Sequence, residues 1–240
     1  MAGRPVAERM RGCFVTGTDT GAGKSVVAAA LCAAMVAAGE RVAAFKPVVT
    51  GIDDPGDGVW PPDHELLAMV TGGRPGAVCA RAFGPAVSPH LAAALAGTAL
   101  ALDELVASAG AALTGACADV LVVEGVGGLL VPLDGEHDIR DLAVALGLPL
   151  VIAARPGLGT INHTLLTIEA ARSAELDVRA VVLTPWPAEP TVMQRSNRET
   201  IAARGKVEVA VLAEVAPVVE ALAMAAAALP WADWLGGASS

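Results

Sequence analysis

Short apolar runs rich in valine alternate along this chain with longer segments whose apolar positions recur at helical spacing. The runs lack an alternation of polar and apolar positions, which is typical of strands covered on both faces of a parallel sheet. They predict seven strands, at residues 13–16, 42–45, 78–83, 120–123, 150–154, 178–183 and 207–212. The segments between them predict helices over 26–38, 64–70, 89–95, 102–113, 141–146, 162–173, 191–203 and 217–229.

This alternation of strands and helices predicts an α/β fold with a single doubly wound, mostly parallel, seven-stranded sheet flanked by helices. We expect one domain over residues 1–240, with residues 1–11 and 236–240 frayed. The Gly-, Pro- and Asp-rich segment 52–62 is interpreted as a mobile loop or one that orders on binding. Ligands of such sheets bind beyond the carboxyl ends of the strands, so the loops that follow the strands are the candidates for chemistry.

The loop after the first strand has the composition of a phosphate site. Residues 12–25 run from the strand through a glycine-rich turn to Lys24 and Ser25, and a helix follows at once. Backbone N–H groups and a helix N-terminus favour bound phosphate, while Lys24 can reach the outer phosphates and the Ser25 hydroxyl can bind Mg²⁺. The loop reads G-x-x-x-x-x-G-K-S from Gly17, one residue longer than the common pattern. We therefore expect a nucleotide site and a fold of the P-loop NTPase type.

Charged residues follow other predicted strands. Lys46 ends the second strand, where it either points to the same rim as Lys24 or is an exposed residue that ends the strand. Asp63 begins a helix and is either an N-cap or a metal ligand. Glu124 ends a buried valine-rich strand, where a carboxylate is costly unless a cation satisfies it. Ser25, Asp63 and Glu124 together would supply oxygen ligands for Mg²⁺.

The loop after the fifth strand, residues 155–166, contains two glycines and leads into a helix. The free N–H groups of that helix N-terminus are a second place for an anion. His163 lies in the first turn of the same helix and is not assigned a catalytic role.

Composition narrows the functional class. Hydrophobic residues make up 54% of the chain, yet no apolar stretch reaches the roughly 18–20 residues of a membrane-spanning helix. The first residues lack the apolar core of a signal peptide, so we expect a soluble cytoplasmic protein. A net charge of −9 without a basic run disfavours nucleic-acid binding. The four cysteines form no C-x-x-C pair and are interpreted as small buried apolar residues.

These features together resemble the dethiobiotin synthetase family of biotin biosynthesis. The resemblance extends from Phe14 to about Val218. It is carried by V-T-G-T-D-T-x-x-G-K-S at 15–25, K-P-V-x-T-G at 46–51, S-P-H-L-A at 88–92, V-E-G-V-G-G at 123–128 and G-L-G-T-I-N-H-T-L-L-T at 157–167. The long first loop is the form that this family uses.

The resemblance implies ATP-dependent carboxylation and ring closure of 7,8-diaminononanoate with CO2 or bicarbonate, with Mg²⁺ as cofactor. Lys46, Lys24 and Thr20 would act on the carbamate and the transferring phosphoryl group, and Thr50 would hold the substrate. In this family the site lies at a homodimer interface, where Gly159, Thr160 and Asn162 of a partner would bind the substrate carboxylate. Nucleotide contacts are implied for Gly21, Ala22, Gly23, Lys24, Ser25, Val26, Asp63, Glu124, Gly125, Val126, Gly127, Thr184, Pro185, Ala216, Pro217 and Val218.

The chain departs from the family pattern at the base end of the nucleotide. Thr184 stands where many members have an Asn, and a hydroxyl lacks the paired donor and acceptor of an amide. The proline of the usual G-E-I-P is displaced by one, to Pro217. We therefore expect other nucleoside triphosphates to compete usefully with ATP. In a second departure, Gly21 stands where some relatives have an acid, so no carboxylate at this position can help to orient the amines.

Two other classes share this kind of core. A partitioning or positioning ATPase switch is the alternative function, but such proteins carry a second lysine early in the loop, where this chain has Thr18, Asp19 and Thr20. An amidoligase of corrinoid synthesis would need an ammonia-supplying domain, for which the chain has no room.

Overall fold

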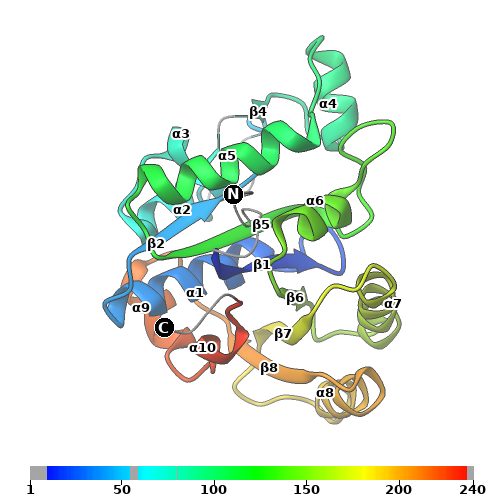
Figure 1. The fold of residues 1–240 in the computed structure, drawn as a ribbon. Helices are drawn as coiled ribbons and strands as arrows, with labels where there is room; N and C mark the ends of the chain where they lie inside the picture. The colour runs from blue at the N-terminus through cyan, green and yellow to red at the C-terminus, as the bar shows by residue number, and fades with distance from the viewer. Residues whose placement is uncertain (1–9, 55–58, 80, 237–240) are drawn as a thin grey trace, which may run out of the picture.

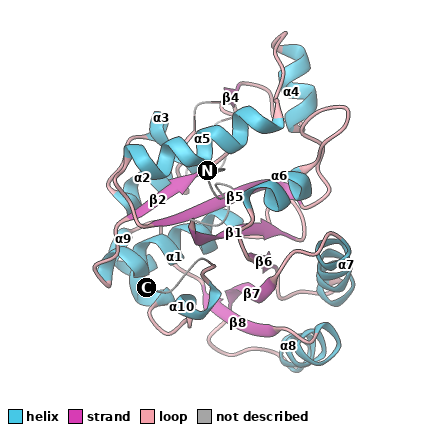
Figure 2. Ribbon diagram, in the orientation of Figure 1, coloured by secondary structure: helices cyan, strands magenta, loops and turns pink. Residues whose placement is uncertain are grey.

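The computed structural model describes residues 10–54, 59–79 and 81–236, and its centre is a parallel sheet with helices on both faces (Figures 1 and 2). Six strands form this sheet in the order β2-β5-β1-β6-β7-β8, and every pairing among them is parallel. The strands are β1 (Arg11–Gly17), β2 (Val42–Phe45), β5 (Val120–Gly128), β6 (Leu150–Ala154), β7 (Val178–Trp186) and β8 (Glu208–Ala213).

Ten described helices connect and cover the strands. They are α1 (Lys24–Ala37), α2 (Asp63–Thr71), α3 (Pro75–Val78), α4 (Pro89–Leu95), α5 (Leu102–Gly115), α6 (Ile139–Leu146), α7 (Thr160–Ser173), α8 (Val192–Gly205), α9 (Val219–Ala226) and α10 (Trp231–Trp234). The α/β class is therefore confirmed, and the predicted helices are present with ends that differ by a few residues. The short α10 was not predicted.

Two hydrophobic cores lie on opposite faces of the sheet. Along β1, Phe14 packs into the core beneath α5, α6, α7 and α8, whereas Cys13 and Val15 pack into the core with α1, α2 and α9. Successive residues of a strand point to opposite faces, so a strand that is buried on both sides has apolar residues at every position. This is the physical reason for the continuous valine-rich runs in the sequence.

The prediction of a seventh strand in this sheet, over residues 78–83, is wrong. Pro75 begins the short helix α3 instead, because its fixed φ suits a first helical turn. Within the described part of this segment, the strand is limited to β4 (Ala82–Phe83), which pairs with β3 (Val49–Thr50) in a separate two-stranded sheet.

The ends of the described chain are better ordered than predicted. Arg11 belongs to β1, and Gly236 exchanges backbone hydrogen bonds with Gly12 at 2.8 and 3.1 Å, so these two positions are not frayed. The other residues predicted to fray, 1–9 and 237–240, lie outside the described residues. Of the cysteines, Cys117 is exposed, contrary to the prediction, while the other three are buried.

The parallel register brings parts of three strands together at one rim. The prediction that Glu124 follows the end of its strand is wrong, because β5 continues to Gly128. Phe45 of β2 lies beside Val123 of β5, and Glu124 lies beside Val15 of β1. Lys46, Glu124 and the loop after β1 are therefore neighbours, although they are far apart in the sequence. Across the described residues, no helix is both long and apolar enough to cross a membrane.

Leu142 tests how much the core under α6 contributes to stability. This side chain is fully buried, whereas Val144 of the same helix is 47% exposed. Leu142→Ala should lower the free energy of unfolding by about 2–4 kcal/mol, because it removes buried methyl groups and leaves a cavity. Val144→Ala is the matched control and should change it by less than about 0.5 kcal/mol. Urea unfolding followed by circular dichroism measures both, and equal effects would contradict this picture of the core.

Candidate active site

The loop between β1 and α1 is shaped by close contacts at two glycines. Lys24 folds back along the loop and its Nζ donates a hydrogen bond of 3.0 Å to the carbonyl oxygen of Asp19. A Cβ on Gly17 would lie 2.9 Å from Lys24 Cγ, so glycine at this position leaves room for the lysine. Gly23 has a φ of +89°, and a Cβ there would lie 2.5 Å from the Thr184 methyl carbon. The loop therefore needs both glycines to seat Lys24 and to pack against the end of β7.

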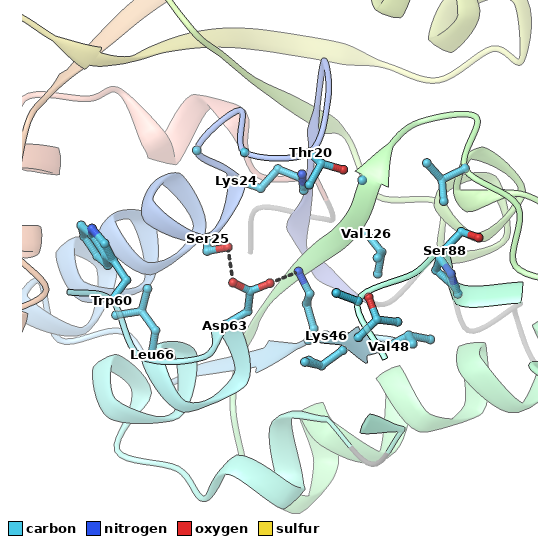
Figure 3. A pocket seen from close by; sticks show the side chains of 18 of the residues that line it. Thr20, Lys24, Ser25, Lys46, Val48, Trp60, Asp63, Leu66, Ser88 and Val126 are labelled. Atoms are coloured by element: carbon cyan, nitrogen blue, oxygen red, sulfur yellow. Dashed lines mark hydrogen bonds and ion pairs between the residues drawn. The ribbon is translucent and has the colours of Figure 1, made fainter. Parts of the chain in front are cut away.

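Beside this loop, Lys46 and the carboxylates of Asp63 and Glu124 form an ionic cluster. Figure 3 shows Lys46 and Asp63 of this cluster together with Ser25. Lys46 Nζ lies 2.5 Å from Glu124 Oε1 and 2.7 Å from Asp63 Oδ2. It also donates to the Gly125 carbonyl oxygen at 3.1 Å, so all three of its N–H donors are engaged. Lys46 is 2% exposed and Glu124 is fully buried, so these two charges compensate one another with little help from water, whereas the Asp63 side chain is 39% exposed.

Ser25 joins the same cluster from the first turn of α1. Its Oγ lies 2.7 Å from Asp63 Oδ1 and 2.8 Å from Glu124 Oε1. A hydroxyl has a single proton, so it can donate to only one of the two carboxylates. The serine oxygen and the oxygen of the other carboxylate then have no proton between them, and a cation would stabilise that arrangement.

The cluster decides between the alternatives that the sequence left open. Asp63 is the first residue of α2, and Pro62 occupies the N-cap position. The carboxylate of Asp63 contacts Ser25 and Lys46, so it does not cap the helix. Lys46 is buried, so it is not an exposed residue that merely ends a strand.

The two lysines of the site differ in their electrostatic environment. Burial, with a smaller contribution from the nearby charge of Lys46, lowers the pKa of Lys24 to about 8. Burial also acts to lower the pKa of Lys46, but the carboxylates of Asp63 and Glu124 outweigh it and raise that pKa above its ordinary value. Lys46 is thus a permanent cation at neutral pH, while Lys24 can lose its proton under mildly alkaline conditions.

The two carboxylates differ as well. Burial opposes ionisation of Asp63, but the charge of Lys46 and the hydrogen bonds from Lys46 and Ser25 prevail and lower its pKa to about 2. Burial, reinforced by the negative charge of Asp63, raises the pKa of Glu124. Glu124 is therefore the group for which an additional positive charge would be most favourable.

Two cavities flank the loop. The first, of about 640 Å³, extends from the loop past Lys46 and Thr50 to the start of α4. The second, of about 560 Å³, lies between the loop and the ends of β7 and β8. Gly21, Gly23, Val26 and Trp60 line both, so the two cavities meet at the loop.

Most of the predicted site residues lie at these cavities. The first is lined by Thr20, Lys24, Ser25, Lys46, Thr50, Asp63, Val126 and Gly127, besides the shared residues. The second is lined by Thr184, Pro185, Ala216 and Pro217. Glu124 and Gly125 do not line either cavity, but both contact Lys46, which lines the first one.

A few predicted residues do not line either cavity. Ala22 is fully buried within the loop, and Val218 stands at the N-cap position of α9. Gly159, Thr160 and Asn162 lie at the start of α7 and are not among the lining residues of either cavity. Within one chain, the predicted carboxylate site is therefore separate from the phosphate site.

Sequence reasoning missed several lining residues. Ser88 was noted only as part of a motif, and it lines the first cavity. Arg155 lines the second cavity, 3.7 Å from Asp19 of the loop. Trp60 lies in the segment interpreted as a mobile loop, where a lone aromatic residue among Gly, Pro and Asp was the available signal.

The donor set at Ser25, Asp63 and Glu124 fits a hard divalent cation. Glu124 Oε2 is buried and has no hydrogen-bond partner among the described residues. A hydroxyl and two carboxylates are ligands that Mg²⁺ accepts, with phosphate and water oxygens to complete six-fold coordination. The described residues contain no cluster of three or more His, Cys, Asp or Glu side chains able to hold an ion without such help.

A glycine-rich loop that leads into a helix at the carboxyl edge of a parallel sheet, with a lysine and a hydroxyl at its end, defines a nucleotide-binding protein of the P-loop class. The fold is shared with the MinC:MinD cell division complex of Aquifex aeolicus, with a TM-score of 0.53, 13% identity, and coverage of 89% of this chain and 85% of that one. A family model described as an AAA domain matches residues 11–223.

Similarity to curated proteins is more specific. The chain is 46% identical to the ATP-dependent dethiobiotin synthetase BioD of Anaeromyxobacter dehalogenans over 176 residues, which are 72% of this chain and 76% of the relative. It is 41% identical to the protein of the same name from Mycobacterium avium over 223 residues, which are 92% and 90% of the two chains. The chain therefore belongs to the family of ATP-dependent dethiobiotin synthetases.

The lowered pKa of Lys24 predicts proton uptake when a nucleotide binds. At pH 8, Lys24 is about half protonated in the free protein, and nearby phosphate charge should raise its pKa and restore the proton. Titration calorimetry with ATP at pH 8 should then give heats that differ between buffers of different ionisation enthalpy. Lys24→Arg is the control, because its guanidinium stays charged and should abolish the buffer dependence. Equal heats in all buffers for the unaltered protein would contradict the assignment.

Proposed function

We propose that the protein forms dethiobiotin from 7,8-diaminononanoate, CO2 and ATP, with release of ADP and phosphate. The observation that carries this proposal is the first cavity, which continues beyond the phosphate loop. It places Lys24, Lys46, Thr50 and Ser88 around a space bounded by valines. An aliphatic diamine acid needs such a chamber next to the terminal phosphate, whereas a nucleotide switch does not. Membership of the dethiobiotin synthetase family supports the same conclusion.

The reaction takes three steps. One amine adds to CO2 and loses a proton, which gives a carbamate. A carbamate oxygen attacks the γ-phosphorus, and the bond from phosphorus to the oxygen of ADP breaks, leaving a carbamic-phosphoric anhydride. The second amine then attacks the carbonyl carbon, loses a proton and expels phosphate as the ureido ring closes. Such phosphoryl transfer requires positioning and charge stabilisation more than covalent catalysis.

The residues of the site suit this task. Lys46 keeps its proton because of its two carboxylate neighbours, so it acts as a fixed cation for the anionic carbamate and not as a base. To reach that anion it exchanges one of its three contacts, of which the one to the Gly125 carbonyl is the longest. Lys24 has a backbone carbonyl as its hydrogen-bond partner and can turn to the transferring phosphoryl group, with Thr20 beside it. Stabilisation of developing charge by such fixed groups is a large part of catalysis.

Mg²⁺ is the cation proposed for Ser25, Asp63 and Glu124, where it would neutralise phosphate charge and share the two carboxylates with Lys46. ATP is the co-substrate, its phosphates lying along the loop and its base in the second cavity. The remaining predicted contacts at Ala22 and Val218 belong to this proposal.

A homodimer is also proposed. At the start of α7, Gly159, Thr160 and Asn162 do not line the chain's own cavities, and Gly159, Asn162 and the adjacent Leu158 are exposed, whereas Thr160 is buried. A helix N-terminus favours an anion, so these residues of a partner subunit would bind the substrate carboxylate. 

The proposed function is tested by phosphate release. Release with ATP should depend on both the diamine and bicarbonate, and mass spectrometry should detect dethiobiotin. A partitioning ATPase would release phosphate at a rate that neither compound changes, and that result would reject the proposal.

Lys46→Ala should abolish ring closure while nucleotide still binds. Loss of the cation should lower the turnover number by about 10²–10³-fold, which is typical for removal of one charge-stabilising group. Turnover is measured by dethiobiotin formation and nucleotide affinity by calorimetry, which also reports whether the variant is folded. Near-normal turnover would show that Lys46 has a structural role alone.

Relaxed nucleotide preference follows from Thr184. This residue is 3% exposed and its methyl group approaches Gly23, so it offers at most one hydroxyl to a base. GTP, CTP and UTP should support turnover within about tenfold of ATP. A site that read the base with a paired amide contact would discriminate between the triphosphates by a larger factor. Initial rates with the four triphosphates measure this, and a preference for ATP of a thousandfold would contradict it.

A further inference from the structure

Trp60 occupies the place where the two cavities meet. It lines both of them, together with Gly21, Gly23 and Val26 of the phosphate loop and α1. Of these four, Trp60 is the one contributed from outside the loop and its helix. Figure 3 shows the indole on the side of the first cavity where Ser25 and Leu66 lie, across from Ser88. A nucleotide with its phosphates along the loop and its base in the second cavity would therefore place its nucleoside beside this side chain.

The indole is the one aromatic side chain among the described residues that line the two cavities. The chain has four tryptophans, three phenylalanines and no tyrosine. Trp186, Trp231 and Trp234 do not line either cavity. An aromatic ring at the meeting point of the cavities is thus a particular feature of this site in a chain poor in such residues.

Neighbouring contacts hold Trp60 in position. The side chain is half-buried and packs against the core that contains α1 and α2. Pro61 and Pro62 follow it and restrict the backbone. Asp63 comes next, and its carboxylate is tied to Ser25 and Lys46 at 2.7 Å. A ring held close to an anchored residue loses little freedom when a ligand stacks on it.

The second cavity provides little for reading a base by hydrogen bonds. Its lining is largely apolar, with Val26, Val59, Val215 and the prolines, and its polar side chains are Arg155, Thr184 and Glu214. Arg155 lies 3.7 Å from the carboxylate of Asp19. Stacking suits such a lining, because every base has an aromatic face and stacking is tolerant of base identity.

We propose that Trp60 is a stacking surface for the nucleoside of the bound triphosphate, and that it supplies base-independent affinity. The proposal rests on the proposed function for the orientation of the nucleotide, with phosphates at Lys24 and the base in the second cavity. It makes Trp60 a determinant of nucleotide affinity and not of base preference: contact with the ring stabilises any of the four nucleosides, and the site then needs no paired hydrogen bonds to the base.

The experiment compares Trp60→Ala, Trp60→Phe and the control Trp231→Phe by calorimetry, in the absence of the diamine. Ligands are ATP, GTP, CTP, UTP and inorganic tripolyphosphate, each with Mg²⁺. Trp60→Ala should weaken binding of all four nucleotides by about 5- to 100-fold and leave tripolyphosphate within about twofold, as expected for loss of one stacking contact. Trp60→Phe keeps a ring and should retain most of the affinity, and Trp231→Phe should match the unaltered protein.

Three results would overturn the proposal. Equal losses for tripolyphosphate would indicate a distorted phosphate loop, and unchanged nucleotide affinity would indicate a packing role. A loss confined to one base would show base reading in place of stacking.

Fluorescence keeps the test decisive if Trp60→Ala does not fold. Nucleotides, but not tripolyphosphate, should change the tryptophan emission of the unaltered protein, and Trp60→Phe should lose that change while Trp231→Phe retains it. No nucleotide-dependent change from Trp60 would overturn the proposal. Neither measurement requires turnover, so an absence of diamine-dependent phosphate release would reject the proposed function alone.

Discussion

The ionic cluster of Lys46, Asp63 and Glu124 is the constraint on which the site depends. Lys46 and Glu124 are almost without contact to water, and an isolated buried charge costs several kcal/mol. The cluster is therefore stable only when all of its members are in place. It ties the end of β2, the middle of β5 and the start of α2 to Ser25 of the phosphate loop. Through Asp63, it also positions the segment that carries Trp60.

The cluster explains why the site has two lysines with different properties. Lys46 is satisfied by two carboxylates and a carbonyl, so its charge is permanent and its position is rigid. Lys24 has a single backbone carbonyl as hydrogen-bond partner and a lowered pKa. An arriving phosphate thus meets one lysine that is fixed and another whose charge the phosphate itself stabilises. Together the two lysines balance the two carboxylates, which leaves the negative charge of a nucleotide to be met by a metal ion.

The same sheet serves proteins with very different roles, as the likeness to the MinC:MinD complex shows. The fold alone therefore does not say what the protein does, and function has to be argued from the site. What distinguishes this chain is the space around the loop. One cavity continues toward Thr50 and Ser88, and a second, mainly apolar cavity lies on the other side of Trp60.

The sequence by itself determined the α/β class, six of the seven predicted strands, the phosphate loop and the choice of Lys46, Asp63 and Glu124 as candidates. These follow from local signals: valine runs, glycine spacing, and charged residues at strand ends. The tertiary structure decided what those signals left open. Asp63 turned out to point at Ser25 and Lys46, the segment at 78–83 left the main sheet, and Trp60 came to lie between the cavities. The physical reason is that burial and charge pairing depend on which strands become neighbours and in which register they pair. Strand order and register are properties of the whole sheet, and local sequence signals do not determine them.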